Sequence, residues 1–225
     1  MKLLLIGHSI IDHFEEKGRY STKPGGIFYT ATGILALKNN LDKIYLITGW
    51  NEKSFYLFQK KYDEVDLTYS EKILEMPEVF LKVNKTDREE IYKSLSNNLN
   101  ITKIDNWNNF EGILINMITG FDLSLEQMKE IRKKYQGLIY LDIHTLSRGV
   151  NSNLERVYRP IPKVEDWISC VDILQVNQFE LNTIFDEINE SDRISKILQY
   201  GPKIILVTKG KRGATAYYEE NENHM

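Results

Sequence analysis

The sequence is poor in cysteine and has no long hydrophobic run. Cys170 is the only cysteine among 225 residues, which excludes an intrachain disulfide framework and a multi-cysteine metal site and is typical of a reducing compartment. The N-terminal apolar run, Leu3 to Gly7, is too short for a signal peptide, and no segment reaches the length of a membrane span. We therefore expect a cytoplasmic protein with no membrane partner.

The sequence also lacks an excess of charge of one sign. It has 29 Lys and Arg against 32 Asp and Glu, a formal net charge of -3, and no long basic block. Nucleic acid and anionic membranes are usually bound through such a block. A small metabolite is therefore the favoured partner, and nucleic acid is not expected.

Three common signatures are missing as well. A dinucleotide-binding fold needs G-x-G-x-x-G between its first strand and helix, where this chain has only Gly7. The P-loop pattern G-x-x-x-x-G-K-[ST] and the nucleophile elbow G-x-S-x-G are also absent. These absences argue against a Rossmann dehydrogenase, a P-loop NTPase and a serine hydrolase of the usual α/β type.

Apolar runs of strand length alternate with segments of helical periodicity along most of the chain. This pattern predicts a single three-layer, doubly wound α/β domain over residues 1–225, with a mainly parallel sheet. The stretch 65–100 instead has short, polar, alternating pieces, which predict a small peripheral sheet. The expected central strands are Lys2–Ile6, Lys43–Thr48, Gly112–Asn116, Leu138–Ile143 and Asp172–Val176.

Helix signals follow these strands. Small and apolar residues recur at helical spacing through Leu37 after the pair Gly25-Gly26, and the sequence from Ser124 to Gln127 has a capping-box pattern. Two further helices are expected, one from Glu52 to about Tyr62 with Asn51 as its cap, and one capped by Ser191.

Two groups of residues stand where an α/β sheet gathers ligands. Asp12 follows the first strand, beyond whose carboxyl end a substrate hydroxyl can be bound, although a solvated loop is the alternative. Gly25 and Gly26 open a helix whose first-turn amides favour an electron-rich group, although a tight glycine turn explains them too. His8 and His13 flank Asp12 without a third ligand at metal spacing, so we interpret them as ordinary polar loop residues.

The stretch from Ile204 to Tyr218 predicts a strand, a tight turn and a second strand. Gly210 and Gly213 lie where the chain reverses, and glycine adopts positive φ there without steric cost. Backbone amides in such a turn can point at a phosphate, and a hairpin with a basic tip is the structural alternative. Arg148, in the loop after an earlier strand, is interpreted as a brace for that loop rather than as a ligand contact.

In this order, the motifs G-H-S-I-I-D, P-G-G, L-D-I-H, D-I-L-Q-V-N-Q-F-E and V-T-K-G-K-R-G resemble the ribokinase-like (PfkB) family of sugar and nucleoside kinases. The resemblance covers essentially the whole chain. Its most specific element is N-x-x-E followed some thirty residues later by T-x-G-x-x-G. It implies transfer of the γ-phosphate of ATP, with Mg²⁺ as cofactor, to a hydroxyl of a sugar or nucleoside.

The resemblance also implies roles for individual residues on the acceptor side. Asp12 would bind substrate hydroxyls, and Gly25 and Gly26 would lie under the substrate. Thr30 would take a position where the family usually has asparagine. Residues 65–100 would correspond to the lid that closes over the substrate, and a homodimer through this lid is an expected partner.

On the donor side, the resemblance assigns residues to phosphates, metal and nucleotide. Asn177 and Glu180 would serve the phosphates and Mg²⁺, with Glu180 acting as a metal residue through water. The residues that would hold the nucleotide are Asn177, Thr208, Lys209, Gly210, Lys211, Arg212 and Gly213.

The chain departs from the family pattern at its end. The family's G-A-G-D motif supplies the anion hole and the catalytic aspartate, and it normally follows the hairpin; this sequence has no such motif before Met225. We therefore expect no catalytic base in these residues and place the expected aspartate beyond Met225. Two hypotheses follow: the chain is the N-terminal part of a kinase, or it is a complete, non-catalytic sugar- or nucleotide-binding or regulatory protein on the same fold. The polar tail favours the first.

Overall fold

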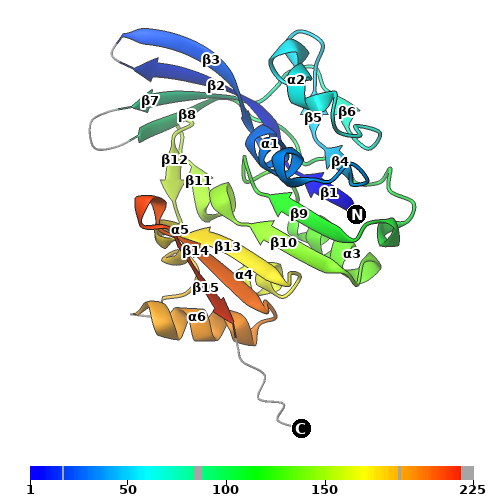
Figure 1. Cartoon of the computed structure of the whole chain (residues 1–225). Coiled ribbons are helices and arrows are strands. Elements are labelled where there is room, and N and C mark those ends of the chain that lie inside the picture. The colour runs from blue at the N-terminus through cyan, green and yellow to red at the C-terminus, as the bar shows by residue number, and fades with distance from the viewer. Residues whose placement is uncertain (17, 84–87, 187–188, 219–225) are drawn as a thin grey trace.

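A central sheet runs through the molecule in the strand order β15-β14-β13-β10-β9-β1-β4 (Figure 1). The computed structural model describes residues 1–16, 18–83, 88–186 and 189–218. All neighbouring pairs in this sheet are parallel except β14 and β15. The strands are β1 (Lys2–Ile6), β4 (Lys43–Ile47), β9 (Gly112–Asn116), β10 (Leu138–Asp142), β13 (Ile173–Asn177), β14 (Ile204–Thr208) and β15 (Ala214–Tyr218). The predicted mainly parallel sheet is confirmed.

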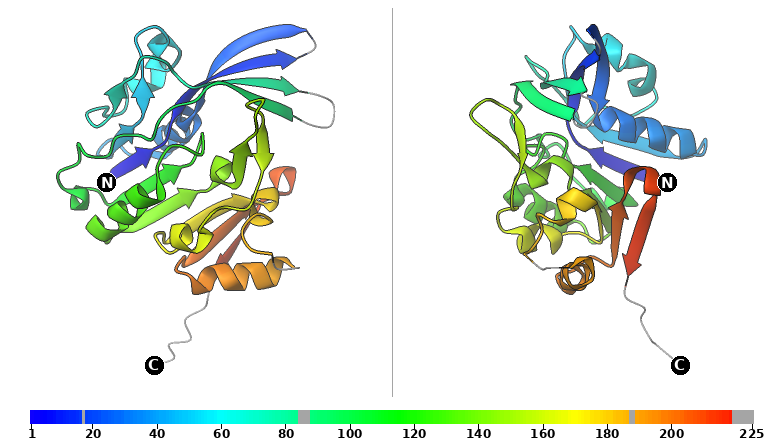
Figure 2. Two further views of the ribbon diagram at one scale, coloured as in Figure 1. Left: turned by 180° about the vertical axis from the view of Figure 1, so that it is seen from behind. Right: turned by 90° about the vertical axis from the view of Figure 1, so that its left-hand side faces the viewer.

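Helices cover the two faces of this sheet to different extents (Figure 2). One face packs against α3 (Leu125–Lys134), α4 (Val164–Ile168) and α6 (Glu190–Gln199), which contribute to the larger hydrophobic cluster. The other face packs against α1 (Ile27–Leu37) and α2 (Gln59–Tyr62) beside β1 and β4. The predicted three layers are therefore present. No helix in the described residues has the length and hydrophobicity that crossing a bilayer requires.

Local signals explain where most helices begin and where two expectations were wrong. Ser124 and Gln127 form the predicted capping box of α3. The expected continuous helix from Glu52 is instead a turn followed by short helices, although Asn51 makes the expected capping contact: its side chain accepts hydrogen bonds from the Ser54 main-chain N–H and hydroxyl. Only η1 (Phe55–Leu57) and α2 follow it. The cap of α6 is Asn189 rather than Ser191, because the Asn189 side chain accepts a hydrogen bond from the main-chain N–H of Asp192.

A second sheet of four strands stands beside the central one, in the order β3-β2-β7-β8 (Figure 1). It consists of β2 (Ser9–Glu16), β3 (Arg19–Gly26), β7 (Glu78–Val83) and β8 (Arg88–Ser94). The stretch 65–100 thus supplies only two of its strands. The residues around Asp12, expected in a loop, form the other half, because the β2–β3 hairpin pairs along its whole length.

The remaining elements are short. Two small sheets pair β5 (Gly49–Trp50) with β6 (Glu71–Lys72), and β11 (Arg148–Val150) with β12 (Arg156–Tyr158). The other short helices are α5 (Gln178–Leu181), η2 (Trp107–Asn109), η3 (His144–Ser147) and η4 (Gly210–Arg212). The final hairpin, β14–η4–β15, is the predicted strand, turn and strand.

The order of strands places a topological switch between β1 and β9. From β1 the chain continues to β4 on one side, then crosses to β9 and proceeds outward in the other direction. Ligands in open α/β sheets gather at the carboxyl ends of the strands that flank such a switch. The end of β9 is Asn116, and β1 leads into the β2 strand that carries Asp12.

Buried charges join the peripheral sheet to the β11–β12 hairpin. Arg156 donates to Glu90 Oε2 (2.6 Å) and to the Tyr92 hydroxyl (2.6 Å), both on β8. Arg148 donates to the same Glu90 oxygen (3.1 Å) and to the Tyr158 hydroxyl (3.0 Å). The interpretation of Arg148 as a brace agrees with these contacts, which connect the β11–β12 hairpin to β8 of the peripheral sheet.

We predict that Arg156→Met destabilises the fold by roughly 3 kcal/mol, the lower end of the cost of breaking a buried ion pair, because Arg148 still faces Glu90. Urea denaturation measures this change. The matched control is Lys129→Met, which removes an exposed pair with Asp166 and should leave the denaturation midpoint unchanged. Equal midpoints for the parent and Arg156→Met would show that the junction does not stabilise the fold.

Candidate active site

Asp12 and Gly25 lie against each other on neighbouring strands of the peripheral sheet. A Cβ atom added at Gly25 would come within 2.3 Å of Asp12 Oδ2, far inside van der Waals contact. Only glycine therefore leaves room for this carboxylate, which is buried. The family resemblance assigned both residues to the acceptor side, and the β2–β3 pairing brings them together.

Gly26 connects this sheet to α1 at the helix N-terminus. Its φ of 68° lies in the left-handed region, and an added Cβ would come within 2.3 Å of the His8 carbonyl oxygen. That oxygen accepts a hydrogen bond from Ile27 N (3.1 Å), which fixes where α1 begins. Thr30 follows as the fourth residue of the helix.

Thr30 is joined to two residues that the sequence analysis did not select. Its hydroxyl donates to Asn116 Oδ1 (2.9 Å), and Asn116 Nδ2 donates to Asp142 Oδ2 (2.8 Å). Both residues end parallel strands, β9 and β10, and they face each other in register. Their place at strand ends beside the switch was the signal available in the sequence.

Asn177 and Glu180 form one capping box at the start of α5. Asn177 Oδ1 accepts from the N–H groups of Phe179 (2.8 Å) and Glu180 (2.9 Å), while Glu180 Oε2 accepts from Asn177 N (2.8 Å). The N-x-x-E spacing is therefore satisfied locally as a helix cap. This accounts for the Asn177 oxygen and for one oxygen of Glu180.

The second oxygen of Glu180 has no hydrogen-bond partner among the described residues, although the side chain is only 2% exposed. His144 Nδ1 lies 3.5 Å from this oxygen. Burial raises the pKa of the neighbouring Asp142 carboxyl, and the charge of Glu180 raises it further. The interaction with His144 lowers the same pKa. The end of the sheet is thus rich in buried negative charge.

This donor set fits a hydrated Mg²⁺ ion. Mg²⁺ prefers oxygen ligands, keeps several waters, and is often held by one or two carboxylates together with substrate phosphates. Within the described residues, no three His, Cys, Asp or Glu side chains are grouped as a complete metal cage. Glu180 Oε1 is therefore suited to hold such an ion through water.

The basic turn lies next to this cap because Thr208 pairs in register with Asn177. Gly210 and Gly213 have φ values of 57° and 88°, as the tight reversal requires. Arg212 hydrogen-bonds to Gln178 Oε1 on α5, and Lys209 pairs with Glu190 on α6 (3.1 Å). The turn is therefore connected to the helix that begins at Asn177.

The two histidines beside Asp12 have different environments. His8 is not an ordinary loop residue: it is buried, its main-chain N–H donates to Asp122 (2.7 Å) and its Nδ1 lies 2.9 Å from Thr119 Oγ1. Burial alone would raise the pKa of the Asp122 carboxyl, but His8 and the surrounding N–H donors lower it overall. This long-range pair was invisible in the sequence.

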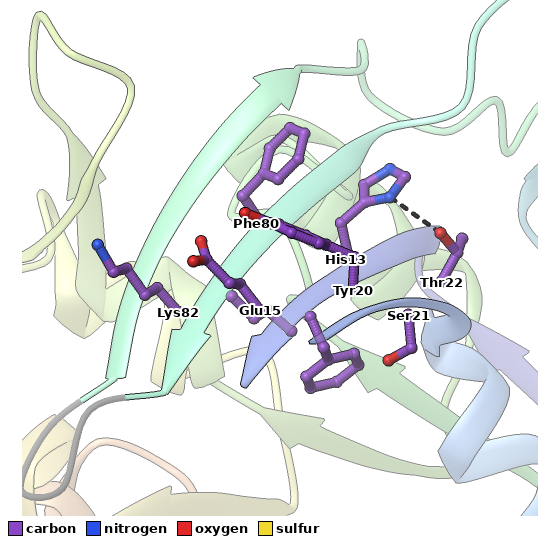
Figure 3. Close-up of a pocket in the computed structure, with 9 residues that line it drawn as sticks. His13, Glu15, Tyr20, Ser21, Thr22, Phe80 and Lys82 are labelled. Carbon is purple, nitrogen blue, oxygen red and sulfur yellow. Dashed lines mark hydrogen bonds between the residues drawn. The ribbon is translucent and has the colours of Figure 1, made fainter. Parts of the chain in front are cut away.

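His13 belongs to the opposite face of the peripheral sheet from Asp12, because successive side chains of a strand alternate. Its ring stacks on Phe80 at 4.8 Å and its Nε2 lies 2.7 Å from Glu78. These rings line a pocket of about 220 Å³, and Glu15 and Tyr20 also contribute to its lining (Figure 3). This pocket is separate from the Thr30–Asn116–Asp142 group.

We predict opposite effects of alanine at two glycines that are seven residues apart. Gly26→Ala should destabilise the protein by at least about 1–2 kcal/mol, because a side chain there adopts a left-handed conformation and clashes with His8. Gly33→Ala should stabilise it by about 0.5–1 kcal/mol, since Gly33 lies inside α1 with open space around it. Thermal unfolding measures both, and a harmless Gly26→Ala would contradict the geometry.

Comparisons with known proteins agree on the architecture. No family model and no curated protein matches the sequence. A pyrophosphate-dependent kinase in the ribokinase family, solved with a pyrophosphate analog and myo-inositol, is 17% identical, with 98% of this chain and 79% of that chain covered and a TM-score of 0.73. Ribokinase from Thermotoga maritima is 17% identical (100% and 76% covered, TM-score 0.69), and fructokinase from Vibrio cholerae O395 is 14% identical (100% and 80%, TM-score 0.72). The chain therefore has the ribokinase-like fold of the PfkB kinases.

Proposed function

We propose that this protein is a kinase of the PfkB type, which transfers the γ-phosphate of Mg·ATP to a hydroxyl of a sugar or nucleoside. The observation that carries the proposal is the meeting of two groups at one edge of the sheet. The hydrogen-bonded series Thr30–Asn116–Asp142 begins at a predicted acceptor residue and ends at a carboxyl that interacts electrostatically with Glu180 on the donor side.

On the acceptor side, the buried Asp12 carboxylate supplies hydrogen-bond acceptors for hydroxyl groups. Gly25 and Gly26 keep side chains away from the backbone, so that a sugar ring can approach it closely. The peripheral sheet, which carries Asp12, serves as the lid over this site. Its buried junction with the β11–β12 hairpin positions it relative to the central sheet.

On the donor side, the turn 208–213 brings Lys211 and Arg212 toward the phosphates, while Lys209 pairs with Glu190. Asn177 and Glu180 lie beside this turn. Mg²⁺ held through Glu180 would neutralise charge on the transferring phosphoryl group. Phosphoryl transfer depends chiefly on positioning and on such neutralisation. We assign the catalytic base to no residue of this sequence, because the G-A-G-D motif that carries it in the resembling family is not among its residues.

The donor assignment is tested by calorimetric titration with β,γ-imido-ATP, with and without Mg²⁺. Glu180→Gln should remove most of the Mg²⁺-dependent gain in affinity, about tenfold or more, because the neutral amide holds a hydrated cation poorly. The control is Glu130→Gln, whose carboxylate only pairs with Lys134 on the surface of α3. Equal Mg²⁺ dependence in all three proteins would rule out a metal role for Glu180.

Turnover separates the kinase from its alternative. We would measure phosphorylated product from ribose, fructose, myo-inositol and adenosine with either ATP or pyrophosphate as donor, since one similar structure is a pyrophosphate-dependent kinase. Product formation supports the enzyme. Because no catalytic base is assigned within this sequence, binding of donor and acceptor without product supports the binding site that the kinase shares with its alternative, a non-catalytic sugar- or nucleotide-binding protein on the same fold. Binding of neither overturns the proposal.

We also propose that the outer face of the lid, formed by His13, Tyr20 and Phe80, joins two copies of the chain. Tyr20 and Phe80 are 78% and 45% exposed beside the pocket in Figure 3. Exposed aromatic side chains of this kind are enriched at protein interfaces. Sedimentation should show a dimer for the parent and a monomer for Phe80→Glu, while Phe121→Glu, at a similarly exposed residue elsewhere, stays dimeric. A monomeric parent would refute this contact.

A further inference from the structure

We infer that Asn116 is a positioning residue that turns the Thr30 hydroxyl into a hydrogen-bond acceptor for the bound substrate. The inference rests on the proposed acceptor site and names the chemical group that Thr30 recognises there, an O–H donor.

The argument starts from Asp142, whose carboxyl Oδ2 is the acceptor of its hydrogen bond with Asn116 in this structure. The Asn116 amide must therefore turn its NH₂ group toward Asp142 Oδ2, at 2.8 Å. This leaves the amide oxygen facing Thr30 Oγ1, at 2.9 Å. An amide oxygen also only accepts, so the Thr30 hydroxyl must use its single proton to donate to it.

The remaining capacity of the Thr30 hydroxyl is its lone pairs. A ligand that contacts this oxygen must then bring the proton, which a sugar hydroxyl does and an ether or carbonyl oxygen does not. Thr30 is half-buried, so its oxygen is partly open. Thr30 in this position therefore selects ligands that carry a hydroxyl group, although a threonine hydroxyl can in general either donate or accept a hydrogen bond.

The fold prevents the Asn116 amide from turning over. Its side chain is 5% exposed, and Asn116 and Asp142 face each other in the register of two parallel central strands. The main chain of Asn116 is also held in place. Its carbonyl oxygen accepts a hydrogen bond from Ile118 N (3.0 Å) and lies so close to Gly7 that a Cβ atom there would clash with it. The direction of the hydrogen bonds is therefore set by the sheet rather than by the ligand.

The test is calorimetric binding of ribose, fructose and myo-inositol at pH 8, without any phosphoryl donor. Asn116→Asp brings two carboxylates into contact and should weaken sugar binding about tenfold or more. The reciprocal double variant Asn116→Asp with Asp142→Asn restores one donor between the two positions and still leaves an acceptor for the Thr30 proton. It should recover binding to within about threefold of the parent.

Substitutions at Thr30 provide a second, independent arm. Thr30→Ser keeps the hydroxyl and should bind sugar within about threefold of the parent, whereas the nearly isosteric Thr30→Val should lose roughly tenfold, the worth of one neutral hydrogen bond. Melting temperatures confirm that each variant is folded. If Asn116→Asp does not fold, the two Thr30 variants and the double variant still test the inference.

Three results would overturn the inference: a double variant no better than Asn116→Asp, unchanged binding by Thr30→Val, or a parent that binds none of the three sugars. Because no donor is present, these results are separate from those of the turnover assay. Sugar binding that depends on Thr30 and Asn116, in a protein that binds no phosphoryl donor, would support the inference and refute the kinase. Transfer with an indifferent Thr30→Val would do the reverse.

Discussion

The register of the parallel central strands is the constraint on which the candidate site depends. Parallel strands place their carboxyl ends at the same edge of a sheet. Here β9, β10, β13 and β14 end together, so Asn116 faces Asp142 and Asn177 faces Thr208. A slip of one residue in any pair would turn these side chains to the other face of the sheet. The polar groups therefore meet because the hydrophobic core fixes the register.

A steric constraint has the same importance on the acceptor side. The Asp12 carboxylate occupies the space above Gly25, and the His8 carbonyl occupies the space beside Gly26. Both contacts require glycine, and both arise from the pairing of β2 with β3, the strand that runs directly into α1. The paired glycines thus serve two functions together: they let the peripheral sheet pass into α1, and they place a carboxylate close to the backbone.

Buried charge is concentrated where the two sheets meet. Glu90 receives two guanidinium groups at the junction, and Asp122 is surrounded by His8 and by main-chain donors. Charges removed from water are costly unless they are paired and hydrogen-bonded. These pairs consequently favour one placement of the peripheral sheet over others. By contrast, Glu180 Oε1 has no hydrogen-bond partner among the described residues and lies 3.5 Å from His144 Nδ1, which sets it apart as a position for a ligand.

The sequence by itself determined the central architecture and the local caps. Continuous apolar runs specify strands buried on both faces, and side chains such as Ser124 or Asn177 cap helices through neighbours three residues away. The order of motifs also resembled the family whose fold the chain has. Only the tertiary structure decided that Asp12 lies in a sheet, that His8 pairs with Asp122, and that Asn116 connects Thr30 to Asp142. These contacts join residues from 26 to 114 positions apart, and no local pattern of hydrophobicity or turn residues encodes such distances.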